Sequence, residues 1–354
     1  MPIWGILCFN REKYHLYILW IISYCLDHSD TFFRSKSDQG LYWCRTPGPL
    51  FYYNYDCHHE YVLNVELTLD TTSAKVCLIT GATDGIGKQT ALELAQLGYS
   101  LVLVGRNTEK GRTTIAELSS RTGNESIQFH CADLSSMKAI SLLCDEIKSS
   151  YDTLDILINN AGAYFREFCK TDEGFEQTFA LNHLAYSYLT QLLLEMVMDG
   201  KPGRIINVAS SAHRNTKFNF NDIQGINDYK GWPAYGRSKL ANIMFTYECH
   251  RRFNDTGVTF NCLHPGFVDS NFGNNNSGFA RKSISFAKFL FAINIVKGAQ
   301  TSIYLASSDE VDGMSGKYFD KCKPTQSSKV SQVKNDQTRL WDISEEMINS
   351  IQPN

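Results

Sequence analysis

The feature that most constrains the fold is a repeated alternation of short apolar runs with helical patterns, which begins at Lys75. The apolar runs are rich in branched residues, as is typical of parallel strands buried on both faces. We predict strands at 76–79, 101–104, 127–129, 154–158, 205–208 and 258–263, and helices at 88–97, 109–120, 137–148, 174–198 and 238–253. This alternation predicts an α/β fold, a doubly wound parallel sheet of the Rossmann type with helices on both faces.

The chain of 354 residues is longer than the ~200 to 250 residues that one α/β domain commonly occupies. The excess lies at the N-terminus, where residues 1–73 are rich in aromatic side chains but show no sustained helical or strand period. We therefore expect three parts: an unassigned N-terminal extension (1–73), a single Rossmann-type domain (74–323) and a C-terminal tail helix (324–354).

Within the extension, residues 16–26 form an apolar and aromatic run that is interrupted only by Ser23 and preceded by Arg11 and Lys13. Such a run is typical of a signal segment or membrane anchor, and equally of a buried or interfacial segment. The cysteine spacings of the extension match no zinc-site pattern, so we expect no metal. The expected location is the cytoplasm or the cytoplasmic face of an intracellular membrane.

The charge balance argues against a general nucleic-acid binder. Lys and Arg total 34 against 37 Asp and Glu, a formal net charge of −3. Such a chain has no global positive field that would attract a polyphosphate backbone.

A glycine-rich turn joins the first predicted strand to the helix that follows it. Gly81, Gly85 and Gly87 permit a tight turn and a close approach of the backbone to a ligand. Asp84 and Ile86 lie in the same turn, and the amino end of the following helix presents free N–H groups to a pyrophosphate. The position of the turn between strand and helix predicts a dinucleotide site.

The end of the second predicted strand bears on the choice of nucleotide. It carries Arg106 where a carboxylate would bind the ribose of NAD, and a guanidinium suits the 2′-phosphate of NADP. We therefore favour NADP(H) over NAD(H), the alternative being a solvated loop arginine. After the third strand, Asp133 precedes Leu134 and either accepts from the adenine amino group or caps the next helix.

Four polar residues are candidates for acid–base chemistry. Tyr235 and Lys239 stand one helical turn apart, so both lie on one helix face, where an ammonium and an oxidised nicotinamide would favour the phenolate. Ser210 follows a predicted strand and could bond a substrate oxygen, or could be a turn serine. Asn182 is polar within an apolar helix and needs a partner such as a buried water. Together they form a proton relay that requires no metal.

These residues resemble the short-chain dehydrogenase/reductase family. The following motifs stand in family order: Thr80-Gly81-x-x-x-Gly85-Ile86-Gly87, Asn159-Asn160-Ala161-Gly162, Asn182, Ser210, Tyr235-x-x-x-Lys239 and His264-Pro265-Gly266. The resemblance implies that Asn160, Ala161 and Gly162 support the cofactor site, and that Lys239 binds the nicotinamide ribose. It further implies that the segment from Pro265 and Gly266 to Val268 contacts the carboxamide. Tyr235 would be the acid/base, Ser210 the residue that orients the substrate, and Asn182 the holder of a relay water.

Finer features resemble the branch of the retinol dehydrogenases and the WW-domain oxidoreductase. These features include a long insertion, residues 213–233, between Ser210 and Tyr235, a strand at 316–319 and a terminal helix near Leu340. The resemblance implies NADP(H) and a lipophilic alcohol, aldehyde or ketone that is retinoid-, steroid- or isoprenoid-like.

Two other functions remain to be weighed against an oxidoreductase. A sugar-nucleotide epimerase or dehydratase shares the Tyr-x-x-x-Lys pair but normally carries a G-x-x-G-x-x-G turn. A cofactor-binding scaffold without turnover would act through the extension. The phenylalanine-rich stretch 267–291 is either an apolar lid over the pocket or ordinary core packing. The expected partners are a small lipophilic substrate and, through the extension, a membrane; association with a second copy of the chain is left open.

Overall fold

The computed structural model describes residues 32–36, 41–45, 51–53, 74–266 and 294–351, and divides the chain into two compact units, Met1–Ser73 and Ala74–Asn354. The apolar run 16–26, the stretch 267–291 and Val268 lie outside the described residues. Among the helices of the described ranges, none has both the length and the apolar character needed to cross a membrane.

The first unit contains a small antiparallel sheet, which the sequence did not predict. Its strands are β1 (Phe32–Lys36), β2 (Leu41–Arg45) and β3 (Phe51–Tyr53), and β2 pairs with both neighbours. Strands this short cannot establish an alternating period, and these three are not runs of branched apolar residues like those that revealed the short strands after Lys75.

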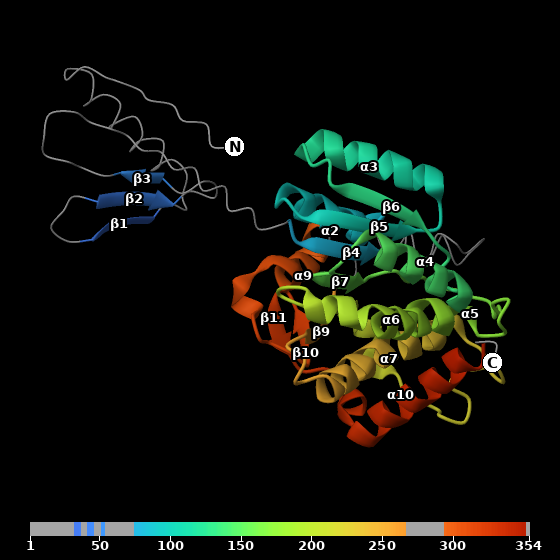
Figure 1. Cartoon of the computed structure of the whole chain (residues 1–354). Coiled ribbons are helices and arrows are strands. Elements are labelled where there is room, and N and C mark those ends of the chain that lie inside the picture. The colour runs from blue at the N-terminus through green and yellow to red at the C-terminus, as the bar shows by residue number, and fades with distance from the viewer. Residues whose placement is uncertain (1–31, 37–40, 46–50, 54–73, 267–293, 352–354) are drawn as a thin grey trace, which may run out of the picture. The chain divides into compact units, whose positions relative to one another are not determined.

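The second unit is built on an eight-stranded sheet (Figure 1). The strands are β4 (Val76–Thr80), β5 (Ser100–Gly105), β6 (Ile127–Cys131), β7 (Ile156–Asn159), β8 (Arg204–Val208), β9 (Thr259–His264), β10 (Lys317–Asp320) and β11 (Lys323–Thr325). Their order is β11-β10-β9-β8-β7-β4-β5-β6, and only β11 runs antiparallel to its neighbour. The predicted doubly wound, mostly parallel sheet is confirmed.

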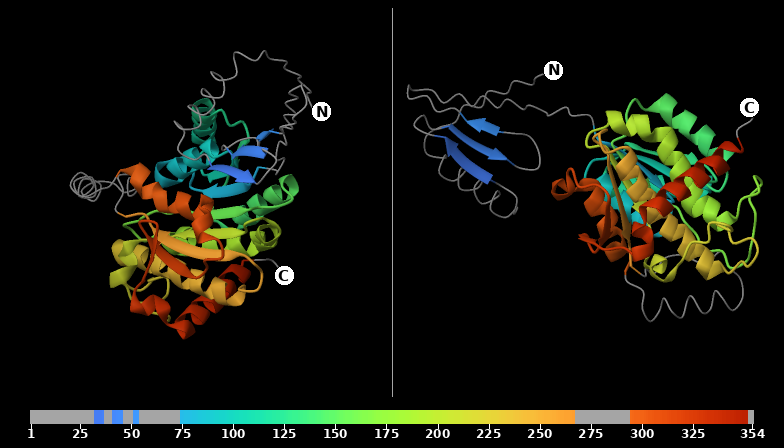
Figure 2. Two further views of the ribbon diagram at one scale, coloured as in Figure 1. Left: turned by 90° about the vertical axis from the view of Figure 1, so that its left-hand side faces the viewer. Right: turned by 90° about the horizontal axis from the view of Figure 1, so that it is seen from below.

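Helices cover both faces of this sheet (Figures 1 and 2). On one face, the core joins residues of α2 (Gly85–Gln96), α3 (Thr108–Thr122) and α9 (Ile295–Ser307). On the other, it joins α4 (Met137–Ser150), α6 (Ala185–Asp199) and α7 (Gly231–Arg252), with α10 (Lys334–Asn349) packed on α7. The short 3-10 helices are η2 (Ser211–Asn215), η3 (Asp309–Val311) and η4 (Lys329–Gln332).

The predicted helix over 174–198 was wrong at its start and in its regularity. Gly174 has a positive φ of 86°, and Glu176 is an extended cap that precedes α5 (Gln177–Phe179). A π-helical turn, η1 (Ala180–Leu184), then leads into α6. Elsewhere, α7 begins at Gly231, earlier than predicted, and α9 was not predicted at all.

The strand order places a ligand site at one edge of the sheet. The order reverses between β4 and β7, which are hydrogen-bonded neighbours. In doubly wound sheets, ligands bind outside the carboxyl ends of the strands at this reversal.

Candidate active site

A cavity of about 690 Å³ is lined by residues at the carboxyl ends of β4, β5, β7, β8 and β9 and at the start of α7. It brings together most of the residues that the sequence predicted for the site: Gly81, Asp84, Gly85, Ile86, Gly87, Arg106, Leu134, Asn160, Ala161, Gly162, Ser210, Tyr235, Lys239, Pro265 and Gly266. Asp133 and Asn182 are not among the lining residues.

The glycine turn after β4 has the geometry that an anion site requires. Gly81 and Gly85 have φ values of 65° and 53°, in the left-handed region that favours glycine. A Cβ at Gly87 would lie 2.3 Å from the Gly81 carbonyl oxygen, so close packing of α2 on the turn requires glycine there. Asp84 accepts from the Gly85 N–H at 2.7 Å and so caps α2. The other first-turn N–H groups have no acceptor within the helix.

Asn160 and Ala161 connect the end of β7 to this turn. The Thr80 hydroxyl accepts from the Asn160 and Ala161 N–H groups at 2.8 and 2.9 Å. The Asn160 amide in turn donates to the Thr80 carbonyl at 2.8 Å. Both residues therefore fix the start of the turn through Thr80, and both also line the cavity.

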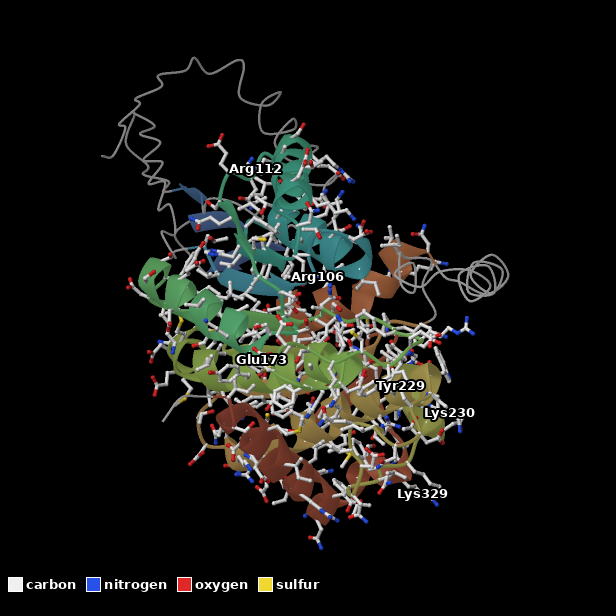
Figure 3. All side chains as sticks on the ribbon, turned by 90° about the vertical axis from the view of Figure 1, so that its right-hand side faces the viewer. Arg106, Arg112, Glu173, Tyr229, Lys230 and Lys329 are labelled. Carbon is white, nitrogen blue, oxygen red and sulfur yellow. The ribbon has the colours of Figure 1, made fainter. Side chains whose placement is uncertain are left out.

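The two candidates for nucleotide recognition differ in their placement. Arg106 is exposed at the end of β5 and lines the cavity (Figure 3), while Asn107 beside it caps α3. Asp133 is exposed and accepts from the N–H and hydroxyl of Ser135. Because Ser136 is the residue that caps α4, the proposed capping role of Asp133 was wrong.

Tyr235, Lys239 and Ser210 meet in the cavity. Tyr235 and Lys239 lie one turn apart on α7, with the Lys239 ammonium 6.0 Å from the centre of the Tyr235 ring. The Ser210 hydroxyl follows β8 and accepts from the Ala212 N–H at 3.2 Å. Burial raises the pKa of Tyr235 to about 12, and a side-chain hydrogen bond with Ser210 opposes that shift.

The electrostatics of this pair differ from the sequence expectation. Burial lowers the pKa of Lys239 to about 7, and its ammonium donates to the Val208 carbonyl at 2.9 Å. A lysine with this pKa is only partly charged at neutral pH. It therefore stabilises the Tyr235 phenolate less than a fully charged ammonium would. Desolvation, which raises the pKa of Tyr235, is the larger effect.

Asn182 lies behind the cavity, in the π-helical turn η1. Its side-chain oxygen accepts from the Ala163 N–H at 2.9 Å, and its amide donates to the Ala163 carbonyl at 2.9 Å and to Ser238 at 3.0 Å. The buried amide of Asn182 thus finds its hydrogen-bond partners in the protein itself, at Ala163 and Ser238. A Cβ at Gly162 would lie 3.1 Å from the Lys239 ammonium and 3.3 Å from the Asn182 oxygen, so glycine permits their close approach.

Two aromatic residues of the cavity region were missed by the sequence interpretation. Trp232 lines the cavity and is 55% exposed, with its ring 5.6 Å from that of Tyr235. Tyr164 packs edge-on against both rings, at 6.0 and 6.4 Å. The sequence signal that could have indicated them is their spacing: Trp232 stands three residues before Tyr235, and Tyr164 stands two residues after Gly162.

Chemically, the cavity joins an anion-binding turn to a phenol, an ammonium and a hydroxyl. In the described ranges, no three His, Cys, Asp or Glu side chains gather as metal ligands would. The family model of short chain dehydrogenases matches residues 75–279. The chain belongs to the short-chain dehydrogenase/reductase family.

Curated relatives place this short-chain dehydrogenase/reductase in the predicted retinol dehydrogenase branch. Mouse retinol dehydrogenase 12 is 39% identical over 274 residues, which cover 77% of this chain and 86% of the relative. Human retinol dehydrogenase 11 is 38% identical over 270 residues, which cover 76% and 84%.

Solved structures agree on the fold of this dehydrogenase/reductase. A Mycobacterium paratuberculosis protein is 27% identical with a TM-score of 0.61, and the match covers 78% of this chain and 93% of that one. Pseudomonas aeruginosa RhlG, solved as an NADP active-site complex, is 24% identical with a TM-score of 0.56, and the match covers 69% and 93%. At that identity the second likeness shows the fold alone.

Proposed function

We propose that this protein transfers a hydride between NADP(H) and a carbonyl or alcohol of a lipophilic substrate, with Tyr235 as the acid/base. The observation that carries the proposal is the convergence of Ser210, Tyr235 and Lys239 in one cavity with the glycine turn. The names of the relatives, retinol dehydrogenases, support a lipophilic alcohol or aldehyde as substrate.

The residues of the turn fit a dinucleotide. The positive-φ glycines bring the backbone close to the cavity, and the first-turn N–H groups of α2 that have no acceptor within the helix suit a pyrophosphate. Arg106 would bind the 2′-phosphate of NADP, and Lys239 the hydroxyls of the nicotinamide ribose. The cofactor, when bound, supplies or accepts the hydride.

The chain's own groups would supply position and the proton. Ser210 would hold the substrate oxygen within reach of the Tyr235 hydroxyl, which donates its proton in reduction and accepts one in oxidation. Lys239 stabilises negative charge on the Tyr235 oxygen whenever it is protonated. Asn182 fixes the segment at Ala163 and is the proposed support of a relay water.

The substrate side of the cavity favours apolar ligands. Ala163, Leu181 and Trp232 line it beside Tyr235. Tyr164 supports both aromatic rings from the side. These groups would bury an apolar body while Ser210 and Tyr235 hold its single oxygen.

The remaining proposals concern the chain as a whole. We take residues 74–323 as the catalytic domain, 324–354 as its tail and 1–73 as an extension that attaches the protein to the cytoplasmic face of a membrane. The spacing of Gly81, Gly85 and Gly87 argues against an epimerase or dehydratase.

The central test compares the purified wild type with Tyr235→Phe. On a panel of retinoid, steroid and isoprenoid alcohols and aldehydes, the variant should lose about 10²- to 10⁴-fold in kcat, as expected for the loss of a general acid/base. NADPH affinity should be retained, because the phenol oxygen is not part of the anion-binding turn. A wild type that is silent on the whole panel with both NADP(H) and NAD(H), yet binds NADPH, would favour the scaffold.

Nucleotide choice is tested by Arg106→Ala with Arg112→Ala as its control. Arg112 is an exposed arginine of α3 that does not line the cavity (Figure 3). Loss of a charge-assisted bond to the 2′-phosphate should weaken NADPH binding about tenfold or more and leave NADH binding nearly unchanged. Equal effects of the two substitutions on NADPH would mean that Arg106 is a solvated loop arginine.

A further inference from the structure

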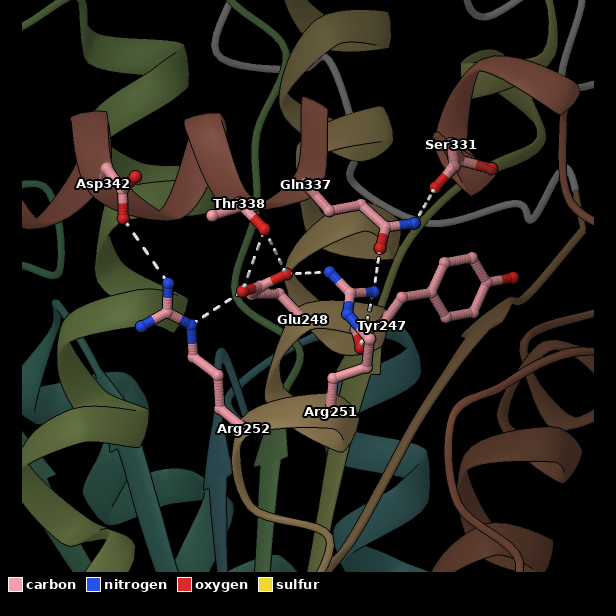
Figure 4. A network of polar contacts seen from close by, with 8 residues as sticks. All are labelled: Tyr247, Glu248, Arg251, Arg252, Ser331, Gln337, Thr338 and Asp342. Atoms are coloured by element: carbon pink, nitrogen blue, oxygen red, sulfur yellow. Dashed lines mark hydrogen bonds and ion pairs between the residues drawn. The ribbon is translucent and has the colours of Figure 1, made fainter. Parts of the chain in front are cut away.

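The C-terminal segment 327–351 includes η4 and α10, both of which pack on α7. Buried Glu248 of α7 pairs with Arg251 and Arg252 and accepts from Thr338 of α10 (Figure 4). Arg251 also donates to Gln337, whose amide donates to the Ser331 carbonyl at 2.7 Å. This network ties the segment to the helix that carries Tyr235 and Lys239.

The same segment reaches the back of the active site through His213. This buried residue of η2 accepts from the Ser328 backbone N–H at its Nε2, at 3.2 Å. Since Nε2 accepts, Nδ1 carries the proton of the neutral ring and donates to the Ser210 carbonyl at 2.6 Å. One imidazole therefore joins the C-terminal segment to the backbone of the residue that faces the substrate.

His183 makes an equivalent connection behind Asn182. It is fully buried in η1, and its Nε2 lies 2.9 Å from the Ser344 hydroxyl of α10. Ser344 donates its own proton to the Leu340 carbonyl at 2.7 Å, so its oxygen accepts from Nε2–H of His183. Nδ1 is then the acceptor of the ring.

The group that faces Nδ1 of His183 is the side-chain amide of Asn242, one turn beyond Lys239 on α7. The Asn242 amide nitrogen is buried and has no acceptor among the described residues. Turning the amide so that its nitrogen faces Nδ1 satisfies both groups at once. His183 then joins α7, η1 and α10 in one directed chain of hydrogen bonds.

We propose that His183 and His213 are positioning residues, through which the packing of the C-terminal segment sets the placement of Asn182 and Ser210. Each imidazole is neutral and uses both ring nitrogens, one toward the segment and the other toward an active-site element. Burial lowers the pKa of each ring to about 4, which keeps this arrangement intact at neutral pH. The inference rests on the proposed function, because Asn182 and Ser210 matter only if the cavity reacts.

The first test reads the tautomers and needs no turnover. Imidazole ¹⁵N shifts of histidine-labelled protein should show His213 protonated at Nδ1 and His183 at Nε2, assigned by their loss in single variants. Protonation of His213 at Nε2 would overturn the proposal, because the bond to the Ser210 carbonyl could not form.

The second test uses amides that mimic one ring nitrogen each. The asparagine amide matches Nδ1 and the glutamine amide matches Nε2. Each variant therefore keeps one bond of the ring and loses the other. Because positioning requires the bond to the C-terminal segment as well as the bond to the active-site element, the Asn and Gln variants of His213 and His183 should each lose about 10- to 100-fold in kcat. A variant that keeps kcat within about twofold of wild type would show that the bond it lacks does not position the active site, and would overturn the proposal for that ring.

Controls separate positioning from stability and from the proposed function. His250 on α7 also bonds a serine hydroxyl, that of Ser315 at 2.9 Å, but neither residue lines the cavity. His250→Gln should therefore leave kcat unchanged. NADPH affinity should stay within about twofold throughout. If the histidine variants fail to fold, Ser344→Ala should still lower kcat, and an unchanged kcat would contradict the proposal. A wild type without turnover refutes the proposed function, whereas imidazole shifts that contradict the assigned tautomers refute the positioning roles alone.

Discussion

At the scale of single residues, the site depends on a lysine that is taken out of water. The side chain of Lys239 is buried, and the Val208 carbonyl that accepts a hydrogen bond from its ammonium does not neutralise the charge. Burial lowers its pKa to about 7, whereas an unfolded lysine titrates near ~10.4. The unfolded state therefore binds more protons between these two values, and the contribution of Lys239 to stability rises with pH in that window.

We predict this rise in the cofactor-free protein. Between pH 7 and pH 9, the free energy of unfolding of the wild type should increase by about 2 kcal/mol relative to Lys239→Met. Urea unfolding of both proteins at the two pH values measures the difference. A constant difference would show that the ammonium keeps its charge in the folded protein. Lys239 would then stabilise the Tyr235 phenolate fully at neutral pH, contrary to the conclusion drawn from its lowered pKa.

At the scale of elements, the helix that carries Asn182 begins with a buried carboxylate. Glu176 accepts from the Thr178 N–H at 2.6 Å and from the Phe179 N–H at 2.8 Å, so both oxygens cap α5. Burial raises the pKa of this carboxyl, and the bonds from Thr178 and Phe179 oppose that shift. The cap therefore fixes the point from which η1 and α6 continue.

Replacing this cap should destabilise the protein. Glu176→Gln puts an amide donor in place of one oxygen and leaves an N–H unpaired, at a cost of about 1 to 3 kcal/mol. Glu167→Gln is the matched control, since Glu167 lies in the same loop and is largely exposed. Denaturant unfolding of the two variants gives the comparison, and equal stabilities would mean that the Glu176 bonds add nothing net.

The same elements show what the sequence could and could not predict. The apolar runs at 76–79 and 101–104 fall within β4 and β5, because strands buried on both faces need continuous apolar residues. The break of the predicted helix 174–198 was invisible, since Glu176 caps through tertiary burial and a π-turn has no distinct sequence pattern. Trp232 was not predicted as a site residue, because only the folded structure places its ring beside that of Tyr235.

At the scale of the whole molecule, the described residues that line the cavity all lie between Gly81 and Gly266, within the unit Ala74–Asn354. That unit has its own core on both faces of the sheet. Catalysis and attachment should therefore be separable. The extension contributes the apolar run 16–26, whose sequence is typical either of an anchor or of a buried segment.

Deletion of residues 1–73 tests this separation directly. NADPH affinity and kcat on a water-soluble aldehyde should stay within about twofold of the full chain, since the described residues that line the cavity all follow residue 73. Sedimentation with membranes should be lost. A double variant of the full chain, Ile18→Lys with Ile22→Lys, should also abolish sedimentation if the run inserts into lipid, because lysine in the apolar core of a membrane is costly. If the deletion instead unfolds the protein, the run packs on protein, and the extension is part of the fold rather than an attachment.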